Sequence, residues 1–399
     1  MIRALTTSIS AMAVLGLPQS ASANTAIDLA IEEGNLPPAS EFARFAPRRD
    51  RVETHIDYAA WDLALDWFVL PMGPSLREGA PRRSPSLGSR VIHGQDSRYR
   101  MEGNRVAFSM LTSEVVSNLT AYREELEELG GKIDIARLPR NEQLAYWFNL
   151  HNVAVIERIA LAYPVGSPRD IKIGNIPLDQ AKFIDVDGIK MSPRDIRTKI
   201  VYPNWDDPRV IYGFWHGEIG GPSLQKVAYN GSNAGILLSA ATNEFVNSLR
   251  GVQKAGDTLL VSELYNEAGA FYFPDFENDL REHITKFAND DVKSILRKTS
   301  GVETGLQATD IADLSKGDRE ADVDVIKTCT DIDLMTATSR LEDACTMRIP
   351  RAPLAAMRFV DERKLKMDKL YKRGLLGRVY MLEGVEIDPE NPELTGEVR

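Results

Sequence analysis

The sequence predicts an α+β fold, with one mixed main domain in which a central helix packs on a small sheet. Apolar residues recur at helical spacing from Asn141 to Tyr163, the strongest helical signal in the chain. A hairpin pattern follows at Phe183 to Met191, and an aromatic and β-branched segment from Arg209 to Trp215 is expected as a strand. Helices and strands are therefore mixed along one region of the chain.

Before the central helix, the chain carries two predicted helices and two short predicted strands. An amphipathic run predicts a helix from Tyr58 to Phe68. A charged amphipathic helix is expected from Thr112 to Leu129, where Gly130-Gly131 would end it. Strand character occurs at Arg90 to His93 and again at Arg105 to Phe108.

The central helix places one set of apolar side chains within a narrow arc, which we expect to be core. Its members are Leu144, Phe148, Val155 and Ile159. Asn152 falls in the middle of this arc and Asn149 at its edge, so at least one amide must be buried. An unsatisfied buried amide costs about 1 to 3 kcal/mol, so Asn152 needs partners. It either clamps the backbone of a neighbouring element or orients a catalytic or ligand-binding group.

Local signals also define the hairpin and the helix that follows it. Asp187-Gly188 suits a type I′ turn, in which both central residues need positive φ. Ser192 is placed as the N-cap of the next helix, with Pro193 at its first position and Asp195 two residues later. These residues satisfy the first amides of the helix and match its dipole.

The rest of the chain is mostly helical by pattern. Its predicted elements are a helix beginning within Leu224–Tyr229, a helix at Ala234–Leu249, a strand at Thr258–Val261, a helix at Pro274–Ala288 and a basic helix at Arg363–Arg373 that ends at Gly374. Charge density rises from about Leu314, so we expect a boundary between Gly301 and Gly317. The predicted regions are 1–23, a signal peptide; 24–137, an N-terminal extension; 138–300, the main domain; and 301–399, a C-terminal region.

The composition is that of a globular protein, with 399 residues, 43% of them hydrophobic, and a formal charge of −10. This hydrophobic content excludes disordered and collagen-like classes. The 58 acidic residues outnumber the 48 basic ones. That balance argues against a nucleic-acid partner, because such proteins need a basic surface.

The N-terminus has the pattern of a secretory signal peptide. Arg3 is followed by a mostly apolar stretch from Ile9 to Pro18 and by the small residues Ala21-Ser22-Ala23. Cleavage after Ala23 would remove 23 of 399 residues and leave 376. No later run of eighteen apolar residues occurs, so we expect no transmembrane segment after cleavage and a periplasmic or secreted location. A buried N-terminal helix is the alternative.

The only two cysteines, Cys329 and Cys345, are expected to form a disulfide in an exported protein. A bond closing a loop of this size contributes about 3 kcal/mol. It requires the chain to turn back between the two residues, because a continuous helix would hold the sulfurs too far apart. Two unpaired buried thiols are the alternative.

The most unusual stretch runs from His216 to Ser223, where the expected strand meets a glycine-rich turn. His216 and Glu218 are candidates for acid/base catalysis there. Gly220 and Gly221, followed by Pro222, would let backbone amides converge on an anion at the start of the next helix. The alternative is a tight turn with a solvated Glu218 and a structurally bonded His216.

Other familiar sites have no pattern in this sequence. The histidines at 55, 93, 151, 216 and 283 include no His-x-x-x-His pair, and no Gly-x-Ser-x-Gly turn marks a serine hydrolase. The turn at Gly220 is neither a dinucleotide fingerprint nor a P-loop. We therefore predict no metal site and no cofactor.

Two segments, Glu142 to Asn152 and Asp207 to Val210, resemble the domain-of-unknown-function family 547 of exported bacterial proteins. The resemblance runs from about Leu138 to Ala288 and includes the capped helix at Ser192 and the Gly-Pro turn. By analogy only, it implies a papain-like or transglutaminase-like fold with a thiol nucleophile.

The nucleophile of the family is missing from this chain. Many relatives carry Cys-Gly-x-x-x-Cys-Pro, and alignment on Pro222 puts His216 and Gly221 at the two cysteine positions. His151 also stands where many relatives have tyrosine.

We therefore expect an exported cell-envelope protein whose ligand-binding pocket lacks a thiol nucleophile. The expected pocket gathers Asn149, Asn152, Arg209, His216 and Glu218, and its partner is an unknown small molecule or envelope component. One alternative is a hydrolase or transferase in which His216 and Glu218 act as acid and base and the amides of Gly220 and Gly221 stabilise an oxyanion. The other is a structural assembly module.

Overall fold

The computed structural model describes residues 41–81, 94–319, 326–327, 347–348 and 354–375. From Phe42 onward the described residues belong to one unit. The expected signal peptide, both cysteines and the expected strand at Arg90 to His93 lie outside the described residues.

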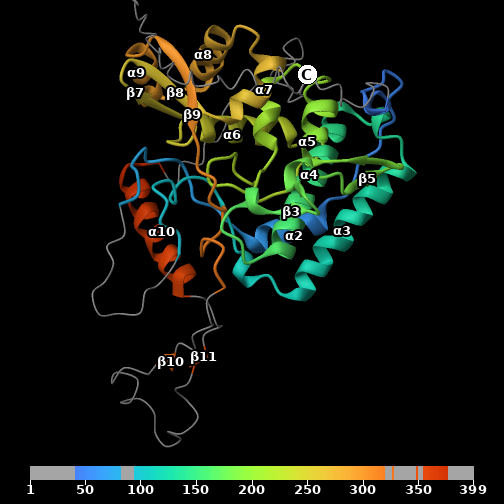
Figure 1. Cartoon of the computed structure of the whole chain (residues 1–399), viewed down its shortest axis with the longest axis horizontal. Coiled ribbons are helices and arrows are strands. Elements are labelled where there is room, and N and C mark those ends of the chain that lie inside the picture. The colour runs from blue at the N-terminus through green and yellow to red at the C-terminus, as the bar shows by residue number, and fades with distance from the viewer. Residues whose placement is uncertain (1–40, 82–93, 320–325, 328–346, 349–353, 376–399) are drawn as a thin grey trace, which may run out of the picture. The chain divides into compact units, whose positions relative to one another are not determined.

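Helices dominate the described chain, and the strands form small separate sheets (Figure 1), which confirms the α+β prediction. The α-helices are α2 Ala59–Phe68, α3 Ser113–Lys132, α4 Arg140–Ala162, α5 Pro193–Asp195, α6 Ala234–Val246, α7 Leu264–Tyr272, α8 Phe276–Phe287, α9 Asp290–Arg297 and α10 Leu354–Lys372. Short 3₁₀ turns are η1 Phe42–Phe45, η2 Phe108–Met110, η3 Ile135–Arg137, η4 Pro168–Asp170, η5 Leu178–Gln180 and η7 Pro208–Gly213, and η6 Ile196–Val201 is π-helical.

Most strands pair with the strand that comes next in chain order. The antiparallel pairs are β1 Val69–Leu70 with β2 Arg105–Val106, β3 Lys172–Ile173 with β4 Ile176–Pro177, β5 Ile184–Val186 with β6 Ile189–Met191, and β10 Ile326–Lys327 with β11 Met347–Arg348. The largest sheet has the order β7 Val252–Ala255, β8 Thr258–Ser262, β9 Gly301–Leu306, with β9 parallel to β8. The interval where we expected a boundary, Gly301 to Gly317, thus begins with a strand of this sheet.

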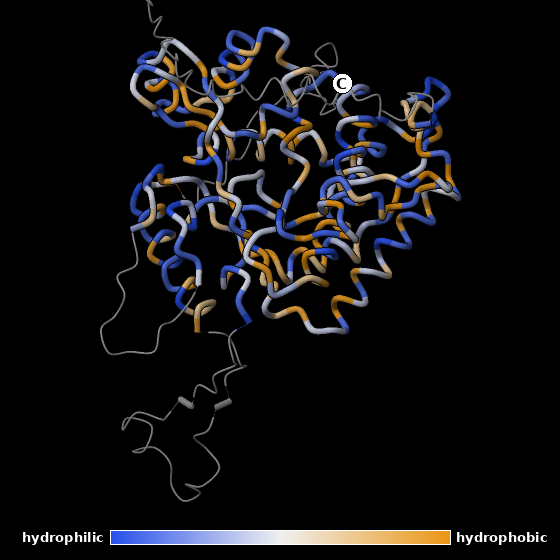
Figure 2. The backbone as a smooth tube through the Cα atoms, viewed as in Figure 1, coloured by the Kyte–Doolittle hydropathy of each residue, from blue (hydrophilic) through white to orange (hydrophobic). Residues whose placement is uncertain are grey.

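Helix α4 is buried on nearly all sides. It packs chiefly against α3, α6 and the α5–η6 segment, which surround it with helices. The predicted apolar arc is buried, but so are Tyr146 and Trp147 outside it. In Figure 2, hydrophobic residues gather around α4, whereas hydrophilic and hydrophobic residues alternate along α3. Burial on nearly all sides places α4 in the core, where its buried polar residues, among them Gln143, Asn149 and Asn152, need hydrogen-bond partners.

The prediction that the helix from Thr112 ends at Gly130-Gly131 is wrong, because α3 continues to Lys132. A Cβ at Gly130 would overlap the Tyr146 hydroxyl and the Val186 side chain. Here glycine serves close packing of α3 against α4 and β5 rather than helix termination.

The hairpin and capping predictions are confirmed. Asp187 has φ 52° and Gly188 has φ 78°, as a type I′ turn requires. The Asp195 amide donates to Ser192 Oγ at 3.0 Å, and the Ser192 amide donates to Asp195 Oδ2 at 2.9 Å. Together they form a capping box at the start of α5.

The expected strand from Arg209 to Trp215 is wrong, because this segment begins with the 3₁₀ helix η7. Asp207 accepts the Arg209 amide at 2.9 Å, and Pro208 fixes the backbone for a helical turn. The apolar residues of η7 are buried against α6 instead of pairing with another strand.

The helix expected to begin within Leu224–Tyr229 is also absent from the described structure, and the next helix is α6. Backbone groups in this segment bond to side chains from distant elements, namely Leu224 O to Asn104, Ala228 N to Asp62, and Tyr229 N and O to Asn149. These bonds occupy backbone groups that a helix would use.

The later helices α6 and α8 and the strand β8 occur where they were predicted, with small differences at their ends, whereas α10 begins at Leu354 rather than at the predicted Arg363. Helix α10 ends at Lys372, and Gly374 has φ +68°. No helix in the described ranges is both long and apolar enough to cross a membrane.

Candidate functional site

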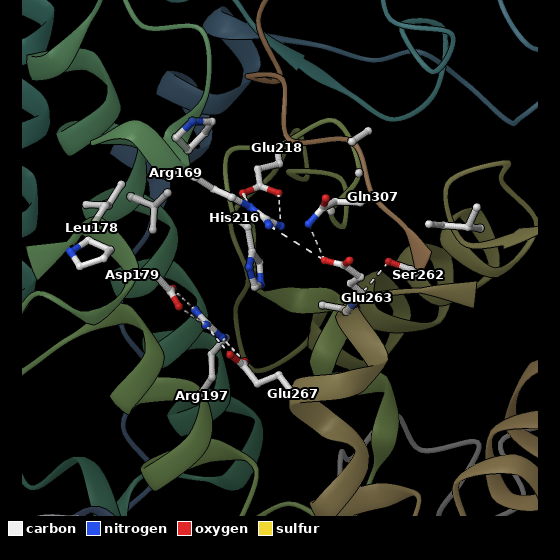
Figure 3. A pocket seen from close by; sticks show the side chains of 18 of the residues that line it. Arg169, Leu178, Asp179, Arg197, His216, Glu218, Ser262, Glu263, Glu267 and Gln307 are labelled. Atoms are coloured by element: carbon white, nitrogen blue, oxygen red, sulfur yellow. Dashed lines mark hydrogen bonds and ion pairs between the residues drawn. The ribbon is translucent and has the colours of Figure 1, made fainter. Parts of the chain in front are cut away.

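A cavity of about 480 Å³ contains His216 and Glu218 (Figure 3). We call it the His216 cavity. It lies where the segment from η4 to η5 meets η6, the 216–221 turn, the β8–α7 junction and the end of β9. Its polar lining residues are Arg169, Asp179, Gln180, Arg197, His216, Glu218, Ser262, Glu263, Glu267 and Gln307.

One wall of the cavity is the Arg197 cluster, which consists of Asp179, Arg197 and Glu267. Arg197 is buried and donates two hydrogen bonds to Asp179, at 2.8 and 2.9 Å. Two more go to Glu267 at 2.7 and 2.8 Å, and a fifth goes to His151 Nε2 at 3.0 Å. Burial raises the pKa of Asp179, but Arg197 overcomes this effect and lowers it. Since all five donors are used, Arg197 has none left for a ligand.

His151 connects the Arg197 cluster to the core. Its Nε2 accepts from Arg197, so its Nδ1 carries the proton and donates to Asn152 Oδ1 at 3.1 Å. Burial and the charge of Arg197 hold the pKa of His151 well below its ordinary value. His151 is therefore neutral and fully bonded.

Asn152 fixes the chain just before His216. Its Oδ1 accepts the Trp215 amide at 2.9 Å, and its Nδ2 donates to Gly213 O at 3.0 Å. Gly217 follows with φ +81°, and a Cβ there would overlap Ile159 and Pro168. The backbone on both sides of His216 is thus held in place.

His216 lines the cavity and has one ring nitrogen without a partner. Its ring lies between the Glu218 carboxylate and the Arg197 cluster (Figure 3). Nε2 is buried and has no hydrogen-bond partner. Burial, together with the charge of Arg197, lowers the pKa of His216 to about 4. The imidazole is therefore neutral at pH 7, and the expected alternative of a structurally bonded histidine does not describe it.

Glu218 forms the opposite wall with Arg169. Arg169 donates to the two carboxylate oxygens at 2.6 and 3.0 Å. The Glu218 side chain is only 12% exposed, so it is not the solvated carboxylate of the alternative interpretation. Burial raises the pKa of Glu218, although Arg169 opposes the shift. Nearby, Gln307 donates to Glu263 at 2.6 Å, and Arg169 lies 4.0 Å from Glu263.

The glycines of the turn line the cavity, but their amides are already bonded. Gly220 N–H donates to Ala308 O at 2.8 Å and Gly221 N–H to Glu218 O at 3.3 Å. No helix begins directly after them. The expected convergence of free amides on an anion is therefore not formed.

Three of the predicted site residues do not line the His216 cavity. Asn149 bonds both backbone groups of Tyr229, at 2.7 and 3.1 Å. Asn152 clamps the chain around Gly213 and Trp215. Arg209 bonds Asp207 and Ser239.

Sequence reasoning missed most of the charged lining. Asp179, Arg197 and Glu267 are far apart in the chain and belong to no short motif. One signal was available, because Arg197 lies among the apolar residues Ile196, Ile200 and Val201. A cation in such a buried segment must find carboxylates elsewhere.

Acceptor groups outnumber cationic groups in the lining of the cavity. Its two guanidiniums are paired, while four carboxylates and a neutral imidazole face the space. Within the described ranges, no three His, Cys, Asp or Glu side chains are grouped to hold a metal ion.

Comparison with known proteins gives one family match. No curated protein and no solved structure matches the chain. The match covers residues 135–246 and so contains α4, Asp179, Arg197, His216 and Glu218. It ends before Glu263 and Glu267, and before Ala288, to which we expected the resemblance to extend. The model that matches residues 135–246 is that of the family described as "Protein of unknown function, DUF547".

Proposed function

We propose that this protein binds a small, hydrogen-bond-donating molecule in the His216 cavity, as an exported cell-envelope protein without a thiol nucleophile. The observation that carries the proposal is the side chain of His216, which lines a cavity of about 480 Å³ and whose buried Nε2 has no hydrogen-bond partner. A volume of this size suits a small molecule. A buried polar atom without a partner is costly, and a bound ligand removes that cost.

The charges of the lining favour a cationic ligand over an anionic one. Four carboxylates, Asp179, Glu218, Glu263 and Glu267, face two guanidiniums, Arg169 and Arg197. Arg197 has no free donor, and Arg169 gives two of its five N–H donors to Glu218. An anion would therefore meet an excess of carboxylates, whereas an amine would meet acceptors.

Export is supported by the sequence alone, through the order of Arg3, the apolar stretch from Ile9 to Pro18 and the small residues before Asn24. It is the reason for placing the ligand in the cell envelope.

Native mass spectrometry of protein purified from its own cell envelope tests the proposal. We expect wild-type protein to carry a bound small molecule and His216→Gln protein to lose it. His55→Gln is the matched control, because His55 is exposed and lies outside the cavity. Wild-type protein without any added mass would contradict the proposal, as would equal retention by the His216→Gln variant.

A second candidate function is a hydrolase or transferase that uses His216 as general base. The neutral state of His216 favours it, since a base needs an unprotonated nitrogen at working pH. Glu218, which is ion-paired with Arg169, would be the acid/base partner of His216. The amides of Gly220 and Gly221 are bonded to carbonyls, so an oxyanion would need other donors. Turnover of a bound ligand, lost in His216→Gln, would favour this function over binding alone.

A further inference from the structure

A second cavity, of about 220 Å³, lies between α10 and the chain segments 76–81 and 100–102. We call it the α10 cavity. Figure 1 shows α10 beside the blue-to-cyan part of the chain. The cavity is lined by Leu76, Glu78, Gly79, Ala80, Pro81, Arg100, Met101, Glu102, Glu362, Leu365, Lys366 and Lys369. None of these residues lines the His216 cavity.

Glu102 is the polar group that the surrounding protein leaves unsatisfied. Glu102 is only 2% exposed. Oε1 accepts from Ser75 Oγ at 2.7 Å, but the buried Oε2 has no hydrogen-bond partner. Burial raises the pKa of this carboxyl, with Arg250 opposing the shift.

Lys366 is the other charged residue of the buried end, and it is 5% exposed. Its Nζ donates to Met101 O at 2.7 Å and to Gly73 O at 3.4 Å, which leaves one of its three hydrogens unused. Burial lowers the pKa of Lys366 to about 8.

The remaining charges of the lining are paired with each other. Arg100 Nε donates to Glu362 at 2.8 Å, and Lys369 donates to Glu78 at 3.1 Å. The groups without an ion pair among the described residues are thus one carboxyl and one amine, at the same end of the cavity. A charged ligand would add an uncompensated charge there, which costs more than burying a hydroxyl.

Apolar side chains form much of the rest of the lining, with Leu76, Met101 and Leu365 as the largest. They suit the hydrocarbon body of a ligand, because burying apolar surface is favourable. A small molecule that combines an apolar ring or chain with one neutral donor group matches both parts of the cavity.

We propose that the α10 cavity is a second binding site, which takes a small neutral alcohol whose hydroxyl donates to Glu102 Oε2. The apolar body of the ligand packs against Leu76, Met101 and Leu365. This site stands on observations independent of His216 and of the function proposed above.

Cyclohexanol is the probe that tests the proposal, with cyclohexylamine and cyclohexanecarboxylate as charged analogues of the same ring. The readout is the methyl signal of Met101 in NMR spectra of the full-length protein, assigned with Met101→Leu. We expect cyclohexanol to shift this signal in a saturable way. The two charged analogues should bind at least tenfold more weakly.

Two variants and one control separate the parts of the site. Glu102→Leu removes the acceptor and should weaken cyclohexanol binding at least tenfold. Leu365→Trp enlarges a side chain of the lining and should also weaken binding. Leu63→Trp changes another exposed leucine, on α2 and outside the cavity, and should leave binding unchanged. Circular dichroism verifies that each variant is folded.

The proposal would be overturned by any of three results. The first is no saturable shift with cyclohexanol in the wild-type protein. The second is binding of a charged analogue as tight as that of cyclohexanol. The third is unchanged cyclohexanol binding in both folded variants, Glu102→Leu and Leu365→Trp.

Discussion

The side chain of Asn152 holds the backbone of Trp215, whose amide donates to Asn152 Oδ1 at 2.9 Å. The same side chain donates to Gly213 O and accepts from His151. One amide in the centre of α4 therefore fixes the segment that carries His216 and joins it to the Arg197 cluster. Positioning of the candidate site and stability of the core depend on the same residue.

Asn152→Ala should destabilise the protein more than Glu218→Ala. The first change leaves the Trp215 amide and the Gly213 carbonyl buried without partners, at a cost of about 2 to 4 kcal/mol. The second leaves Arg169, which is half exposed and regains water, so the loss is about 1 kcal/mol or less. Urea unfolding at pH 7 measures both. Equal midpoints for the two variants would show that the clamp contributes little.

The dependence of stability on pH should change when His216 is replaced. The pKa of His216 is about 4 in the folded protein, below the ordinary value near 6.5, so the unfolded chain takes up the proton first. Protonation therefore favours unfolding as the pH falls from 6.5 toward 4. Between pH 7 and pH 5, the free energy of unfolding should fall by about 1 kcal/mol less in His216→Gln than in wild type.

The stability of His216→Gln at pH 7 should remain within about 1 kcal/mol of wild type, because the ring makes no hydrogen bond that the change removes. Urea unfolding curves at the two pH values provide the measurement. Parallel loss of stability in both proteins would mean that His216 titrates normally.

The hairpin and the capped helix could be predicted because their causes are local. Asp187-Gly188 and Ser192-Pro193 determine backbone geometry within four residues. The strand prediction for Arg209 to Trp215 is wrong because the aromatic and β-branched residues of this segment suit any buried backbone. Asp207 and Pro208 start a helical turn there, and packing against α6 replaces strand pairing.

The candidate site could be predicted only at His216, Glu218 and the two glycines, which one turn brings together. Arg197, Asp179 and Glu267 come together through tertiary packing between η5, η6 and α7. They lie too far apart in the sequence to form a short motif that could predict this contact. Asn152 was recognised as a buried amide, but its partners at Gly213 and Trp215 depend on the fold.

Gly221→Cys tests whether this turn can activate a thiol. A Cβ at this position would lie 3.6 Å from Glu218 O and 3.7 Å from the His216 Cβ, so a cysteine fits. No helix starts here to lower the thiol pKa, and carboxylates outnumber guanidiniums around the cavity. We expect alkylation by iodoacetamide at position 221 to have a midpoint at or above the ordinary pKa of about 8.5.

Peptide mass spectrometry distinguishes position 221 from the two native cysteines. A midpoint more than about one pH unit below the ordinary value would show that the turn still provides a field that activates a nucleophile. The papain-like analogy would then have a physical basis in this chain.

Exported protein should begin at Asn24 and contain a bond between Cys329 and Cys345. Signal cleavage follows the small residues Ala21-Ser22-Ala23, and an oxidising compartment favours pairing of the two thiols. Intact mass after alkylation of unreduced, unfolded protein measures both features. An uncleaved N-terminus with two alkylated cysteines would contradict export and the disulfide together.

The most direct measurement is the ¹⁵N chemical shift of His216 Nε2, followed by NMR at pH 7 during titration with two four-carbon probes of opposite charge. Only five histidines contribute ring signals, and His216→Gln assigns the relevant one. We expect 1,4-diaminobutane to shift the Nε2 signal in a saturable way and succinate to leave it unchanged, since four carboxylates and only two guanidiniums line the cavity. A larger shift with succinate, or no shift with either probe, would contradict binding of a hydrogen-bond-donating ligand at His216.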